Sequence, residues 1–265
     1  MGFRKLLASL GAGGASVETE LAQADAVPGG VVQGEVRIQG GAVGQRIEGL
    51  AVGLRARVEA DRTDAEGNTT EYHQDIEFHR QQLGGAFELS AGAVHVVPFT
   101  LEVPWETPVT TFLGRHLTGM SLGVTTELAI DRAVDAGDLD PLSVHPLPAQ
   151  QALLDAFGRL GFGFRSADLE KGVIVDTRQR LPFYQEIEFR VPDQYRGLSQ
   201  VELSFVADAA GMDVVLEMDK KPGLFSVGSD MYRSFTMDHH SYEQTDWAGF
   251  LHQWLAEVGG KRNWF

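Results

Sequence analysis

The feature that most constrains this fold is a two-residue alternation of apolar and polar side chains, which recurs along most of the chain. It is clear in VVQGEVRIQ, residues 31–39, and returns in SQVELSF, residues 199–205. Successive side chains of a strand point to opposite faces of a sheet, so this period indicates half-buried strands. Turn sequences such as Pro-Gly-Gly at residues 28–30 separate the segments. The chain is therefore expected to be mainly β.

A proline-rich connector divides this pattern into two halves. Pro141, Pro146 and Pro148 lie within eight residues. Because proline fixes φ and removes a backbone donor, the stretch is expected to be extended and stiff. Apolar residues at helical spacing follow it, at positions 153, 154, 157 and 160, and predict a connector helix. Many short strands with glycine and proline turns are typical of sandwiches.

We therefore predict two β-sandwich domains in tandem, spanning residues 1–140 and 141–265, with the three prolines as an interdomain hinge. A short amphipathic helix is also predicted at residues 3–10. A second long helix is predicted at residues 243–258, because a stripe of large apolar side chains recurs there at helical spacing.

The aromatic residues near the C-terminus are candidate partner-binding residues. Trp264 and Phe265 follow the predicted C-terminal helix, which itself carries Trp247 and Trp254. Chain ends that lack packing are normally polar, and large aromatic side chains often anchor interfaces. Two interpretations stay open: the tail docks into a groove of its own chain, or it docks onto a partner protein or a second subunit.

The charge and composition of the chain exclude several classes of protein. The chain has 22 Lys and Arg against 37 Asp and Glu, a net charge of −15. A nucleic-acid partner is not expected, because binding to phosphates requires a basic stripe. No apolar run approaches the roughly 20 residues of a membrane span, so no transmembrane segment is expected. The absence of cysteine excludes thiolate chemistry and fits a reducing compartment, so the protein is expected to be cytoplasmic.

No catalytic residue or cofactor site can be assigned from the sequence. No cysteine is available as a nucleophile, and the glycine-rich stretch at residues 11–14 lacks the lysine of a phosphate-binding loop. With 37 acidic residues, no carboxylate pair stands out as an acid–base pair. The protein is therefore not expected to be an enzyme.

Four aspartates precede the connector: Asp131, Asp135, Asp138 and Asp140. Carboxylate oxygens are the ligands that Ca²⁺ prefers, so these residues are a candidate metal site. A solvated charged run at a linker is the simpler interpretation of the same residues.

Several longer segments share a pattern with one known family. They are residues 3–21, VPGGVVQGEVRIQGG at 27–41, VHPLPAQQALLDAFGRLGF at 144–162, LPFYQEIEFRVP at 181–192, VELSFVA at 201–207 and MDVVLEMDKK at 212–221. In these segments the chain resembles bacterial sporulation-control proteins of the stage-zero M type, whose fold is arrestin-like. The resemblance implies two arrestin-like β-sandwich domains, no enzyme activity and no catalytic residues. It further implies control of sporulation or cell development through contacts with other proteins, either regulatory or of the cytoskeletal and division machinery.

The main hypothesis is thus a cytoplasmic, non-catalytic adaptor that binds other proteins and needs no cofactor, with a homo-oligomer as an open possibility. The alternative is a β-sandwich module that binds a small ligand, such as a carbohydrate, or calcium.

Overall fold

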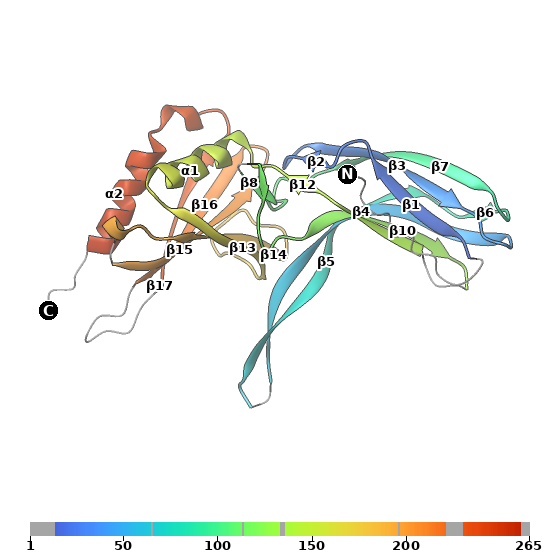
Figure 1. Cartoon of the computed structure of the whole chain (residues 1–265), viewed down its shortest axis with the longest axis horizontal. Coiled ribbons are helices and arrows are strands. Elements are labelled where there is room, and N and C mark those ends of the chain that lie inside the picture. The colour runs from blue at the N-terminus through green and yellow to red at the C-terminus, as the bar shows by residue number, and fades with distance from the viewer. Residues whose placement is uncertain are drawn as a thin grey trace. The chain divides into compact units, whose positions relative to one another are not determined.

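The computed structural model describes residues 14–64, 66–112, 114–132, 136–195, 197–220 and 230–260, and over these residues the protein is mainly β (Figure 1). This confirms the predicted fold class. Neither described helix has the length and apolar character needed to cross a bilayer. The helix predicted at residues 3–10 lies outside the described residues.

The chain divides into two compact units that are not consecutive in sequence. The first comprises residues 1–57, 75–104 and 121–144, and the second comprises residues 58–74, 105–120 and 145–265. The boundary predicted between residues 140 and 141, and the assignment of two β-sandwiches, stay predictions.

The first unit contains two sheets and a short parallel pair. The three-stranded sheet has the order β1 (Ser16–Leu21), β3 (Val31–Gln39), β7 (Val94–Glu102). The other has the order β11 (Ala136–Pro141), β10 (Leu122–Ile130), β4 (Gln45–Thr63), with β5 (Thr69–Gly84) and β6 (Phe87–Leu89) also paired to β4. The parallel pair is β2 (Asp25–Ala26) with β12 (Ser143–Val144). β4 and β5 contribute residues to both units.

The core of the first unit follows the alternation seen in the sequence. In β3, Val32, Val36 and Ile38 are fully buried, while their polar neighbours are exposed. Burying an aliphatic side chain of this size contributes about 1.5–3 kcal/mol to folding. The two sheets also meet through a buried polar contact, because the hydroxyls of Thr19 in β1 and Thr126 in β10 are 2.6 Å apart.

The second unit is built on an antiparallel sheet whose five strands follow one another in chain order, with two helices on one face (Figure 1). The strands are β13 (Gly163–Lys171), β14 (Phe183–Arg190), β15 (Leu198–Ala207), β16 (Gly211–Lys220) and β17 (Asp230–Asp238). The helices are α1 (Pro148–Arg159) and α2 (Trp247–Gly260). Smaller elements are β8 (Thr111–Phe112), β9 (Arg115–His116), η1 (Asp193–Tyr195) and η2 (Tyr242–Gln244).

Helix α1 forms where the sequence predicts it. Pro148 occupies the first helical turn, where its missing N–H costs nothing. The side chain of Gln150 accepts a hydrogen bond of 2.8 Å from the backbone N–H of Leu147, which caps the helix start. Phe157 is fully buried, and its ring stacks on Phe189 of β14 with centroids 4.6 Å apart. This contact attaches α1 to the sheet.

Helix α2 begins four residues later than predicted. A carboxylate oxygen of Asp246 accepts a hydrogen bond of 3.2 Å from the N–H of Gly249, and the helix starts at Trp247. The expected apolar stripe is confirmed as a packing surface for Phe235 of β17. The ring of Phe235 lies 5.6 Å from Trp247 and 5.2 Å from Trp254, between centroids.

The loop that follows β13 is held by a glutamine side chain. Residues 163–171 form β13, and residues 172–175 form a loop. The side chain of Gln179 holds this loop, since it accepts a 2.8 Å hydrogen bond from the N–H of Ile174 and donates one of 2.8 Å to the carbonyl of Gly172. These local bonds take the place of a strand ladder.

Candidate functional site

The sheet of the second unit carries a row of carboxylates on one face, which we call the acidic face. In β14, Ile187 and Phe189 point to the side of the helices, so Glu186 must point to the opposite side. Residues that lie directly opposite each other on antiparallel strands share a face. The pairing of the neighbouring strands therefore places further carboxylates on the same face as Glu186. The acidic face comprises Asp168 and Glu170 of β13, Glu186 of β14, Glu202 of β15 and Glu217 of β16.

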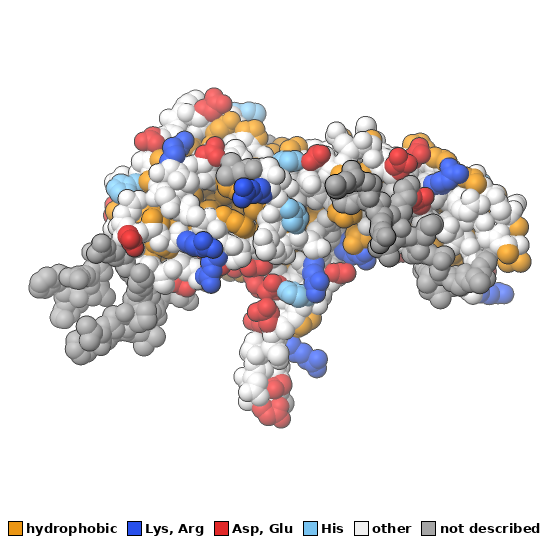
Figure 2. Space-filling model, viewed as in Figure 1, with side chains coloured by type: hydrophobic (Ala, Val, Ile, Leu, Met, Phe, Trp, Pro, Cys, Tyr) orange, Lys and Arg blue, Asp and Glu red, His pale blue; other side chains and the backbone are white. Residues whose placement is uncertain are grey.

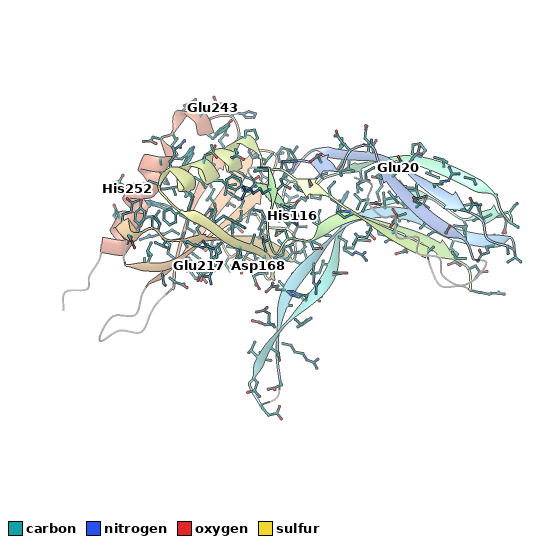
Figure 3. The ribbon with its side chains drawn as sticks, in the orientation of Figure 1. Glu20, His116, Asp168, Glu217, Glu243 and His252 are labelled. Atoms are coloured by element: carbon teal, nitrogen blue, oxygen red, sulfur yellow. The ribbon has the colours of Figure 1, made fainter. Side chains whose placement is uncertain are left out.

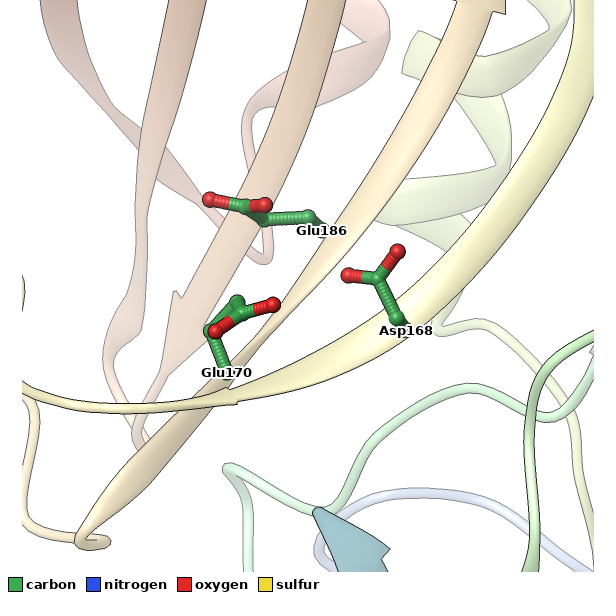
Figure 4. Close-up of side chains that lie close together, drawn as sticks. All are labelled: Asp168, Glu170 and Glu186. Atoms are coloured by element: carbon green, nitrogen blue, oxygen red, sulfur yellow. The ribbon is translucent and has the colours of Figure 1, made fainter. Parts of the chain in front are cut away.

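These carboxylates lie close together. Asp168, Glu170 and Glu186 each have an oxygen within 4.8 Å of the others (Figure 4), and the same holds for Glu186, Glu202 and Glu217. All five side chains are half-buried. In the space-filling view, a group of acidic side chains lies near the position labelled Asp168 in the stick view (Figures 2 and 3). Either triad has the oxygen ligands that a divalent cation requires.

Three of these carboxylates have no neutralising partner among the described residues. No described side chain or backbone group donates a hydrogen bond to Asp168, Glu170 or Glu186, and the Oδ1 atom of Asp168 is buried without a partner. Two neighbouring carboxylates, by contrast, do have partners. Glu188 forms an ion pair with Arg165, and Glu202 accepts a hydrogen bond of 2.5 Å from Gln200. The negative charge of the face is therefore concentrated at its β13–β14 side.

Burial and mutual repulsion change the ionisation of these groups. Burial, followed by the charges of Glu202 and Asp168, raises the pKa of Glu186 to about 8. Burial, followed by the charge of Glu59, raises the pKa of Asp168 to about 6. Desolvation also raises the pKa of Glu170 and of Glu202. Removal of a charged group from water disfavours its ionised form, so the free face retains protons near neutral pH.

A groove of about 370 Å³ adjoins the acidic face. Its lining combines acidic and apolar side chains, and three of the apolar ones are largely exposed: Val173 at 66%, Val175 at 79% and Tyr232 at 64%. Large apolar side chains exposed beside a half-buried carboxylate such as that of Glu186 are typical of a binding surface.

The predicted aspartate cluster lies in the first unit. Asp138 is on β11, where its Oδ2 atom accepts a hydrogen bond of 3.1 Å from the N–H of Thr19. Asp140 is on the same strand, and Asp131 lies in the turn before it, 3.7 Å from Arg132. Asp135 lies outside the described residues. Calcium binding at this cluster stays a prediction.

The predicted partner-binding aromatics are found in two situations. Trp247 is 8% exposed, and its indole N–H donates a hydrogen bond of 2.8 Å to the carbonyl of Tyr242. Trp254 is half-buried against Phe235. Trp264 and Phe265 lie outside the described residues. A partner-binding role for these side chains stays a prediction.

The three prolines of the predicted hinge fall at element boundaries. Pro141 is the last residue of β11, and Pro148 is the first residue of α1. Pro146 lies between β12 and α1. Their role as a hinge stays a prediction.

The acidic face was not predicted from the sequence. Its residues come from four strands and are spread from Asp168 to Glu217, so no local motif marks them. The available signal was the alternation of acidic and apolar residues at Glu186-Ile187-Glu188 and again at Val201-Glu202-Leu203. Acids at every second position place charge on one face of a sheet.

The fold and this face define a mainly β protein with a row of carboxylates on one sheet, and comparison with known proteins gives its family. The SpoOM protein family model matches residues 3–222, a range that includes all five carboxylates of the acidic face. The sporulation-control protein spo0M of Bacillus subtilis (strain 168) is 33% identical over 233 residues, which cover 87% of this chain and 85% of that protein. The chain belongs to the SpoOM family, which confirms the resemblance seen in the sequence motifs.

A solved structure agrees with this assignment. The crystal structure of Spo0M, sporulation control protein, from Bacillus subtilis matches with a TM-score of 0.76 at 26% sequence identity. The match covers 93% of this chain and 99% of that chain.

Proposed function

We propose that the protein is a non-catalytic regulatory protein that controls sporulation or cell development through contacts with other proteins. Its relative in Bacillus subtilis is named a sporulation-control protein, which supports the regulatory role. The observation that carries the proposal is the acidic face. Half-buried carboxylates without partners destabilise a fold, and natural proteins retain such features mainly where function requires them.

The open position of the acidic face favours binding over catalysis. Perturbed carboxylates also occur in active sites. Proton transfer gains most, however, where a site excludes water. Asp168, Glu170 and Glu186 are only half-buried on a sheet surface, so they suit the recognition of a charged partner better. A cytoplasmic location is part of the proposal, because a chain of 265 residues without cysteine suits a reducing compartment.

A genetic experiment tests this function. We expect deletion of the gene in its native host to alter the yield or timing of spores or of developmental cells, and we expect the wild-type gene to restore them. Affinity purification with the intact chain and with a chain ending at Gly260 should recover a discrete protein partner. Loss of that partner on truncation would assign the contact to Trp264 and Phe265. Normal development of the deletion strain would contradict the regulatory role.

A calcium-binding module is the second candidate function. The observation in its favour is that Asp168, Glu170 and Glu186 bring oxygens within 4.8 Å of one another while Oδ1 of Asp168 is buried without a partner. A ligand that binds only the folded state raises its stability. Calcium should therefore raise the unfolding temperature of the wild-type chain but not of Glu186→Gln, and no change in the wild type would remove this candidate.

A further inference from the structure

The groove beside the acidic face has two chemical characters. One part of its lining is apolar and exposed, with Val173 and Val175 in the loop after β13 and Tyr232 on β17. The other part is acidic, with Glu186 and Glu217. Lysine and arginine side chains have the same division, because a long aliphatic stem carries a cationic head. The apolar part of the groove therefore suits the aliphatic stem of either side chain, and the acidic part suits its cationic head.

The charge needed to complete the site is positive. Glu186 belongs to both the groove lining and the carboxylate triads, and no described residue neutralises it. Arg233 also lines the groove, but it forms no ion pair with any described carboxylate. The net charge of −15 would draw a basic segment towards the protein before contact.

Arginine has two advantages over lysine in this groove. Its planar guanidinium can form paired hydrogen bonds with a carboxylate such as that of Glu186. It also packs on aromatic rings, and the groove offers those of Tyr184 and Tyr232.

We propose that this groove binds a segment of a partner protein through an arginine or lysine side chain, whose stem packs on Val173 and Val175 and whose cationic head meets Glu186. The inference rests on the proposed function, since it names the chemistry of the partner that a regulatory protein of this kind recognises.

A fluorescence-anisotropy titration of the purified full chain tests the inference, at a pH above 8 where the carboxylate of Glu186 is largely ionised. The probe is a labelled short peptide in which arginine alternates with valine, and the matched probe carries citrulline, a neutral isostere, in place of arginine. We expect the arginine peptide to bind at least about tenfold more tightly than the citrulline peptide, because hydrogen bonds between ionised partners are about twice as strong as neutral ones. Equal affinity for both peptides would overturn the proposal.

Two variants localise the binding. Glu186→Gln should weaken the arginine peptide by about tenfold, and Val175→Ser by a smaller factor, because it removes only the apolar contact. The control is Glu35→Gln, an exposed acid of β3 whose replacement removes the same charge. Its affinity should change by less than about twofold. An equal loss with Glu186→Gln and Glu35→Gln would show nonspecific attraction and overturn the proposal.

The same variants separate this inference from the proposed function. If the wild-type gene restores development in the deletion strain but the purified chain binds no arginine peptide, the function stands and the inference fails. If the peptide binds through Glu186 but deletion leaves development unchanged, the inference stands and the function fails. Calcium binding by the wild-type chain, without peptide binding, would replace the inference with a metal site.

Discussion

Asp168 and Glu186 lie directly opposite each other on the antiparallel strands β13 and β14, with carboxylate oxygens within 4.8 Å. Like charges in opposed positions destabilise a sheet. Because both side chains are half-buried, water screens their repulsion less than on an open surface. The acidic face therefore reduces the stability of the fold that carries it.

Neutralising one of these carboxylates should stabilise the protein. Glu186→Gln keeps the shape of the side chain and removes the charge that burial disfavours. We expect the free energy of unfolding at pH 8 to rise by about 1–2 kcal/mol, a figure reduced for the partial exposure of the group. Urea unfolding measures it, with Glu35→Gln as the control that should stay within about 0.5 kcal/mol of the wild type. A fall in stability would contradict the repulsion inferred at this site.

The stability of the wild-type chain should decrease as the pH rises from 5 to 8. The pKa of Glu186 is raised to about 8 and that of Asp168 to about 6, so across this range the folded state holds more protons than the unfolded state. Stability falls with pH wherever the folded state binds more protons. The stability that protonated Asp168 contributes is lost as the pH rises through about 6. The stability that protonated Glu186 contributes is lost as the pH rises through about 8.

Urea unfolding at several pH values measures this profile. The decrease between pH 5 and pH 8 should be about 2 kcal/mol in the wild type and smaller in Glu186→Gln. A stability that is flat or increases over this range would show that the carboxylates ionise at their ordinary pKa values.

Local sequence patterns predicted the elements in which one face is strongly apolar. The alternation in β3 and the helical spacing of Leu153, Leu154 and Phe157 in α1 both correspond to buried side chains. The same pattern is weak in β13, because its inward positions are Ala167 and Leu169, a small and a single large apolar residue between polar neighbours.

The site could not be predicted, because it depends on strand register. Asp168 and Glu186 are 18 positions apart in a chain with 37 acidic residues, and only the pairing of β13 with β14 brings them together. A shift of the register by one residue would move every side chain of a strand to the other face. Register is decided by burial across the whole sheet, which no short motif contains.

The loop between β9 and β10 approaches β13 closely at a glycine, Gly119. Gly119 has φ +101°, and a Cβ atom there would overlap the carbonyl oxygen of Ala167 in β13. The adjacent Thr118 carbonyl accepts a hydrogen bond of 3.2 Å from the N–H of Ala167. We expect Gly119→Ala to lower the free energy of unfolding by about 3 kcal/mol, through strain in both the backbone and this contact.

A matched glycine separates the two causes of this effect. Gly114 has φ +69° and open space around its Cβ position, so Gly114→Ala should cost only about 1 kcal/mol from its backbone conformation. Thermal unfolding of both variants measures the difference. Equal losses of stability would show that the close approach of Gly119 to Ala167 adds no cost beyond that of the backbone conformation.

Gln185 anchors the loop between β7 and β8 through Val109, and its side chain lies on the face of the sheet opposite the acidic face. It is 6% exposed on the helix-facing side of β14, where its side chain accepts a hydrogen bond of 3.0 Å from the N–H of Val109 and donates one of 2.7 Å to the carbonyl of the same residue. Gln185→Leu leaves both backbone groups buried and unpaired, so we expect a loss of about 2–4 kcal/mol in urea unfolding. The control Gln151→Leu removes only a solvent-exposed bond to Asp155 and should change stability by less than about 0.5 kcal/mol. Because Glu186 points to the other face, the folded fraction of Gln185→Leu should bind the arginine peptide as the wild type does, and a loss of that binding would show that the acidic face depends on the Val109 contact.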